Sequence, residues 1–142
     1  MVKVNTKTYR IIAFILILVF CASFPATIVS AEGSQYITNY VTGITAGSNG
    51  KINVNFQITG VGAMDQIGAI EIYIYENGTT VKTFYSSSTS GMMGSNTVIH
   101  SSSVTYNGTV GKSYSAYVVY QAGKNGDWDN TGVLTSSVTA KN

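Results

Sequence analysis

Residues 51–60 read KINVNFQITG, and apolar and polar side chains alternate along this whole stretch. Because successive side chains of a β-strand point to opposite faces, Ile52, Val54, Phe56 and Ile58 would share one face. The pattern predicts a strand with one buried side and one solvent-facing side, as is common in antiparallel sheets. It therefore favours an all-β fold.

Six further stretches carry a strand signal, in a region rich in Thr, Val, Ile, Tyr, Ser, Asn and Gly. Two are strong (residues 69–76 and 113–122) and four are weaker (residues 36–44, 79–85, 100–106 and 132–139). The expected inward-facing residues of the strong stretches are Ile70, Ile72 and Ile74 in the first, and Tyr114, Ala116, Val118 and Tyr120 in the second. Seven short strands in one domain indicate a sandwich or a small barrel.

Asn-Gly pairs separate several of these predicted strands, at residues 49–50, 77–78, 107–108 and 125–126. Both residue types tolerate positive φ, so each pair predicts a tight turn. In an up-and-down chain the first three turns would share one pole of the domain. The other pole would then carry three longer connections, which are residues 60–69, 86–96 and 122–132. Since binding residues concentrate on loops held by a rigid scaffold, we expect that pole to bind.

The N-terminus predicts export. Three basic residues within positions 1–10 precede the apolar run IIAFILILVF, and the small residues of VSA at 29–31 come directly before Glu32. This is the pattern of a secretory signal peptide, residues 1–31, that is removed on export. Residues 32–142 would remain as a single secreted domain, with no membrane attachment after cleavage.

Two alternatives to cleavage exist. Residues 11–31 are long enough to span a bilayer, but Pro25, Thr27 and Ser30 interrupt the second half of the run. Lipidation of Cys21 would need a small residue before the cysteine, and Phe20 is large. Cleavage is therefore the favoured interpretation.

Composition argues against several functions. Loss of the basic N-terminus turns the formal net charge of +2 into a slight excess of acid, so no basic patch for nucleic acid is expected. The single cysteine, Cys21, leaves with the signal peptide, so no disulfide is expected. His100 is the only histidine, too few for a hydrolase triad or a zinc site, and it fits an edge or surface position. We expect no catalytic residues, no cofactor and no enzymatic activity.

Residues 111–126, GKSYSAYVVYQAGKNG, resemble the F strand and F–G turn of fibronectin type III and related immunoglobulin-like domains. Tyr114, three residues after Gly111, resembles the tyrosine of the tyrosine corner, whose hydroxyl bonds to backbone just upstream. With MDQIGA (64–69) and SGMMGSN (90–96), the chain is similar to small secreted β-sandwich proteins of Gram-positive bacteria without assigned function. The resemblance implies a seven-stranded antiparallel immunoglobulin-like sandwich. It departs from the fibronectin pattern in strand B, where Phe56 would fill the place of the usual tryptophan.

The stretch KNGDWDNTG, residues 124–132, sets the only tryptophan, Trp128, between Asp127 and Asp129. We expect a hairpin tip with Trp128 at least partly exposed. Together with Asp65 across the same pole, these residues form the candidate ligand-binding set, for a glycan, a cell-wall polymer or a protein. The alternate acids also imitate the start of an EF-hand calcium loop, but Val138 stands where the bidentate acid should be, so no metal site is predicted.

Other apolar and aromatic residues have a structural interpretation beside a functional one. Met64, Ile67, Met92 and Met93 are expected to plug the open end of the sandwich rather than form an adaptable contact surface. A second group, Tyr73, Tyr75 and Tyr117, would point outward from neighbouring strands, and cross-strand packing would account for it.

The sequence thus favours a secreted, non-enzymatic β-sandwich module that binds through the three longer connections. The alternative is a small secreted effector, such as a bacteriocin-like toxin, or a subunit of an extracellular matrix built on the same fold.

Overall fold

The computed structural model describes residues 34–142, which form β-strands joined mostly by short connections, with no helix in that range. The predicted signal peptide, including Cys21, lies outside the described residues. The strands are β1 (Ile37–Ala46), β2 (Lys51–Met64), β3 (Gln66–Glu76), β4 (Thr79–Tyr85), β5 (Met93–Gly94), β6 (Thr97–Asn107), β7 (Ser113–Lys124), β8 (Asp127–Leu134) and β9 (Val138–Thr139).

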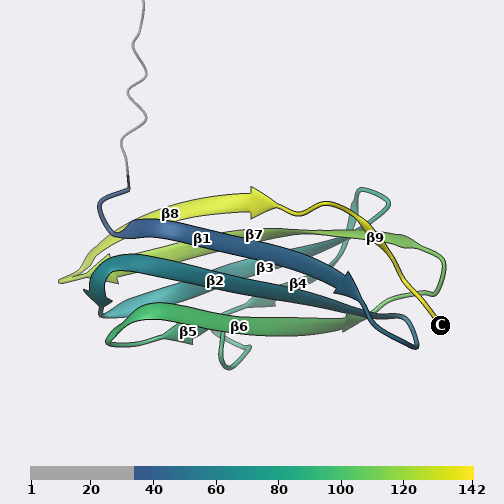
Figure 1. Cartoon of the computed structure of the whole chain (residues 1–142), viewed down its shortest axis with the longest axis horizontal. Coiled ribbons are helices and arrows are strands. Elements are labelled where there is room, and N and C mark those ends of the chain that lie inside the picture. Colours follow the sequence, from purple (N-terminus) through teal and green to yellow (C-terminus); the bar gives the residue numbers. More distant parts are fainter. Residues whose placement is uncertain (1–33) are drawn as a thin grey trace, which may run out of the picture. The chain divides into compact units, whose positions relative to one another are not determined.

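The strands form two antiparallel sheets (Figure 1). The three-stranded sheet has the order β1-β2-β6, and the larger sheet has the order β4-β3-β7-β8. The two-residue strands β5 and β9 pair with β3 and β7. The predicted all-β fold of two antiparallel layers is confirmed. Each predicted stretch overlaps a strand, although several strands are longer than predicted.

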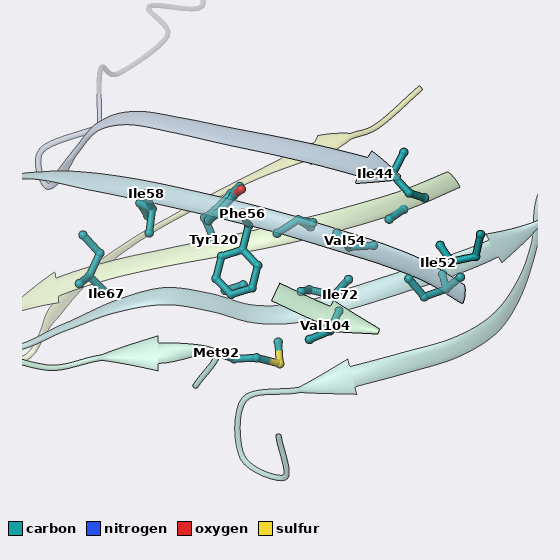
Figure 2. Packing of buried hydrophobic residues seen from close by; sticks show 14 of the residues in the cluster. Ile44, Ile52, Val54, Phe56, Ile58, Ile67, Ile72, Met92, Val104 and Tyr120 are labelled. Carbon is teal, nitrogen blue, oxygen red and sulfur yellow. The ribbon is translucent and has the colours of Figure 1, made fainter. Parts of the chain in front are cut away.

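The core lies between the sheets and is built from the inward-facing residues of β2, β3 and β7 (Figure 2). The predicted face of β2 is confirmed, because its four apolar side chains are at most 3% exposed. The predicted face of β7 is buried as well, and Tyr120 packs edge-on against Phe56 with ring centroids 6.3 Å apart. Burial of each such side chain contributes roughly 1.5–3 kcal/mol. Of the four residues predicted to plug the open end of the sandwich, Met64, Ile67 and Met92 are buried and Met93 is half-buried.

A β-bulge changes the predicted face of β3. Ala69 pairs with Tyr120 and Glu71 pairs with Val119, so Ile70 is an extra residue without its own partner on β7. Ile70 was expected in the buried row with Ile72 and Ile74, and this is wrong, because Ile70 is only half-buried. The alternation resumes after the bulge, which lets residues on both sides of it face the core.

Three of the four Asn-Gly pairs are tight turns with positive φ at both residues: residues 49–50, 77–78 and 125–126. The prediction is wrong for Asn107–Gly108, since neither residue has positive φ. Asn107 instead ends β6, and the chain crosses to β7 through residues 108–112, where Gly111 supplies the left-handed conformation with φ 84°.

The predicted pole of long loops is wrong for two of its three connections. Only Asp65 separates β2 from β3, and only Asn125 and Gly126 separate β7 from β8. The strands continue because their backbones stay paired: Gly60 pairs with Ile37, and Gly123 pairs with Trp128. Residues 86–96 are the one long connection of the three.

Candidate binding face

Trp128 lies in β8 directly after the β7–β8 turn, and its side chain is 45% exposed, as predicted. The indole covers Gly123 on the paired strand. A Cβ built on Gly123 would lie 2.1 Å from Cε3 of Trp128, far inside van der Waals contact. Glycine is therefore needed at position 123 for the ring to lie flat across the strand.

Tyr117 repeats this arrangement further along the same two strands. A Cβ on Gly132 would lie 2.2 Å from the Tyr117 hydroxyl oxygen, so the phenol ring leans across β8 at that point. Gly123 is paired with Trp128, and Gly132 is paired with Val119, which is two residues from Tyr117 on β7. Strand alternation therefore places both rings on the outer face of the larger sheet.

Outward-facing tyrosines extend this surface onto β3. Tyr73 is paired with Tyr117, and their ring centroids are 6.4 Å apart at 42°. Tyr75 and Tyr117 line a shallow pocket together with Leu134, which is 60% exposed. The two groups predicted separately, Trp128 and the three tyrosines, thus belong to one face. We call this surface the aromatic face; it comprises Tyr73, Tyr75, Tyr85, Tyr117, Trp128 and Leu134.

The aromatic face contains few polar groups. The Tyr73 hydroxyl donates a hydrogen bond to the Glu71 carboxylate, and this bond is the main reason that the pKa of Tyr73 is raised to about 12. Between Trp128 and Tyr117, the Gln121 amide nitrogen donates to the Asn130 side-chain oxygen over 3.0 Å. This amide pair retains other donors and acceptors that a ligand could use.

Asp127 and Asp129 are adjacent to Trp128 in sequence, but strand alternation directs them to the opposite side of β8. Oδ2 of Asp129 accepts hydrogen bonds from the Ser34 hydroxyl over 2.7 Å and from the Tyr36 backbone N–H over 2.8 Å. These bonds, that of Ser34 first, lower the pKa of Asp129. The carboxylate therefore fastens the start of β1 to β8.

Asp65 also has an internal role. Its backbone N–H donates to the Gly123 carbonyl over 2.9 Å, and its Oδ2 accepts from the Asn125 N–H over 2.8 Å. Asp65 thus ties the β2–β3 connection to the β7–β8 turn. Among residues 34–142, no three acidic, histidine or cysteine side chains are grouped closely enough to hold a metal ion.

The Tyr114 hydroxyl makes the contact that the tyrosine-corner resemblance implies. It accepts a hydrogen bond from the Thr109 N–H over 2.8 Å and donates to Glu76 over 2.5 Å. The ring also packs on Gly108, whose absent Cβ would lie 2.7 Å from Tyr114 Cζ. This arrangement holds the β6–β7 connection against the core.

His100 lies half-buried on β6, an edge strand, which agrees with the predicted position. Its Nε2 is 2.8 Å from the Gly91 carbonyl oxygen, and its ring centroid is 6.2 Å from that of Phe56. These contacts link the β4–β6 connection to the three-stranded sheet.

Sequence reasoning missed Tyr85, Leu134 and the Gln121–Asn130 pair. The signal was present in residues 127–134, where Trp128, Asn130, Gly132 and Leu134 alternate with inward positions. Treating the stretch as a loop concealed this period of two.

No protein-family model, curated protein or solved structure matches the chain. Within residues 34–142, no helix has the length and apolar character needed to cross a membrane.

Proposed function

We propose that the chain is an exported, non-catalytic β-sandwich module of the immunoglobulin-like type that binds a neutral glycan on its aromatic face. Support for the immunoglobulin-like type comes from the two-sheet strand order and from the Tyr114–Thr109 hydrogen bond. Support for export comes from the signal-peptide pattern of residues 1–31.

The observation that carries the proposal is the gathering of exposed and half-buried rings on one face of the larger sheet. Trp128 and Tyr85 are 45% and 46% exposed. Tyr117 belongs to β7, which lies between β3 and β8, and its ring leans over Gly132 of β8. Leaving large apolar rings in water is unfavourable, and contiguous exposed patches of this kind mark interaction sites. Aromatic rings laid flat on a sheet offer the C–H faces of sugar rings a matching apolar surface.

The charge of the face favours an uncharged ligand. The outward positions of β3, β7 and β8 hold no lysine or arginine, so there is no cation to pair with phosphate or carboxylate groups of a polymer. Their one acid, Glu71, is engaged by Tyr73. The Gln121 and Asn130 amides are suited to the hydroxyl groups of a neutral sugar.

The length of the face favours a chain of sugars over a single one. Trp128 and Leu134 are six residues apart on β8, which corresponds to about 20 Å along an extended strand. An oligosaccharide lying along β7 and β8 would contact Trp128, then the Gln121–Asn130 amides, and then Tyr117.

The test uses protein purified from the medium of an exporting host, with intact mass expected to show Glu32 as the first residue. Affinity electrophoresis in soluble neutral polysaccharides, together with pull-down on cellulose and chitin, should show binding. Trp128→Ala and Tyr117→Ala should each weaken that binding at least tenfold, as expected of aromatic anchors. Val41→Ala removes an apolar side chain that is 55% exposed on the other sheet and should leave binding unchanged.

Failure of the wild-type protein to bind any neutral polysaccharide would refute the proposal. Binding only to anionic polymers such as teichoic acid, or only to a protein, would refute the assigned ligand. Equal binding by wild type and both aromatic variants would show that the aromatic face is not the site.

A further inference from the structure

We propose that two copies of the chain pair through the free edge of β6, in antiparallel orientation, and join their three-stranded sheets into one. β6 ends that sheet, and no other strand of residues 34–142 pairs with its outer edge. An unpaired strand edge presents backbone donors and acceptors that a second strand can complete. The inference is independent of glycan binding, because β6 and the aromatic face belong to different sheets.

The sheet edges of this molecule differ in how they are protected. β8 carries Asp127 and Asp129, and β4 carries Lys82 together with an irregular register opposite Ile74 and Tyr75. Charges and bulges of this kind are the usual means by which proteins prevent edge pairing.

The remaining edge strand of the three-stranded sheet, β1, is occupied by contacts with the larger sheet. Its start is fastened to Asp129 through Ser34 and Tyr36. Further along, the Tyr120 hydroxyl donates a hydrogen bond to the Val41 carbonyl over 2.9 Å. A second chain would have to displace these bonds in order to pair with β1.

β6 is less protected, because its one irregularity of register lies at its start, between Thr97 and Ile99. The contact of His100 with Gly91 joins the strand to the β4–β6 connection through a side chain and not through the backbone edge. The eleven residues of β6, TVIHSSSVTYN, contain no charge and no proline, and their pairing with β2 is unbroken from Ile99 to Asn107. The absence of charge matters for self-pairing, because a two-fold axis places each residue of β6 opposite a residue of β6 in the second copy. A charged strand would therefore meet its own sign near the axis, whereas β6 would not.

The middle of β6 is suited to such an axis. Ser102 is the central residue of the strand, and an axis there would pair Ile99 to Thr105 of the two copies, all within the regularly paired part of β6. Ser101 would then face Ser103 of the partner copy, so small side chains meet at the centre. Ile99, which is 51% exposed, would face Thr105 of the other copy and be covered. Because this pairing consumes both β6 edges, assembly stops at a dimer.

The test is analytical ultracentrifugation of the exported protein over a concentration series. Wild type should sediment as a concentration-dependent dimer. Ser101→Lys/Ser103→Lys would place lysines directly opposite each other across the axis and should weaken dimerisation at least tenfold. Asn55→Lys/Gln57→Lys is the matched control, because these residues pair with Ser103 and Ser101 one strand further from the edge. It should retain the dimer.

A charge-reversal mixture separates loss of pairing from loss of folding. Ser101→Glu/Ser103→Glu should be monomeric alone and should form a heterodimer when mixed with the lysine variant. A wild type that stays monomeric at every concentration would overturn the proposal. So would a dimer that survives the lysines at 101 and 103, or one that is lost equally with lysines at 55 and 57.

Discussion

The indole of Trp128 lies directly over the backbone of Gly123, so close that no side chain fits at position 123. Gly123→Ala should therefore push the ring away from the strand or strain the hairpin. Overpacking of this kind costs roughly 1–3 kcal/mol in the free energy of unfolding. Chemical denaturation, followed by the fluorescence of the single tryptophan, measures both effects. Gly43→Ala is the control, since no atom lies within 4 Å of a Cβ there, and it should stay near wild type.

Tyr114→Phe should destabilise the fold by about 1–3 kcal/mol, because the Thr109 N–H would lose its partner in a largely buried setting. Tyr106→Phe, whose ring centroid is 5.9 Å from that of Tyr114, removes a hydroxyl without breaking the bond to Thr109 and should cost less. Urea denaturation of both variants makes the comparison. Equal losses would mean that the Tyr114–Thr109 bond contributes nothing specific.

Acid should loosen the start of β1. The pKa of Asp129 is lowered in the folded state by its bonds to Ser34 and Tyr36, so the carboxylate stabilises the fold above its unfolded pKa. That contribution is lost as pH falls below about 4 and through the folded pKa. Asp129→Asn should flatten the acid limb of a stability–pH curve. Hydrogen exchange at the Tyr36 amide should accelerate over the same pH range.

Tyr73 should ionise late in an alkaline titration. Its pKa of about 12 means that it stays protonated where an unfolded tyrosine ionises, so its contribution to stability is present below pH 10 and is lost as pH rises toward 12. Ultraviolet titration of the phenolate band should show a late-ionising tyrosine. Glu71→Gln removes the carboxylate that accepts the bond and should shift this titration to lower pH. An unchanged titration curve would contradict the assignment.

Alternation predicted the inward faces of β2 and β7 correctly, because in a two-layer fold burial follows a period of two whenever a strand is regular. It failed at Ile70, since a bulge changes the period and leaves no mark in a single sequence. The Asn-Gly rule succeeded at three pairs, where both residues have positive φ, and failed at Asn107, which remains paired within β6.

The candidate site was only partly predictable. The exposure of Trp128 followed from its acidic neighbours, yet the surface it belongs to depends on the pairing of β7 with β8. Residues 127–131 had the composition of a loop but became strand, because each has a partner on β7. Asp65 and Asp129 were expected to bind a ligand. The structure gives each of them backbone N–H partners within the chain.

The placement of β6 and the aromatic face on different sheets has a consequence for residence on a surface. In an antiparallel pair of identical strands the two-fold axis runs perpendicular to the sheet. Rotation about that axis leaves each side of the sandwich facing the same way, so the two aromatic faces of a dimer would point in the same direction. A polymer with a repeating structure could then be held at two points at once. The second contact would form at an effective concentration far above that of free protein, and release would require both contacts to open together. Weak recognition by each copy would thus become lasting attachment to a wall or fibre.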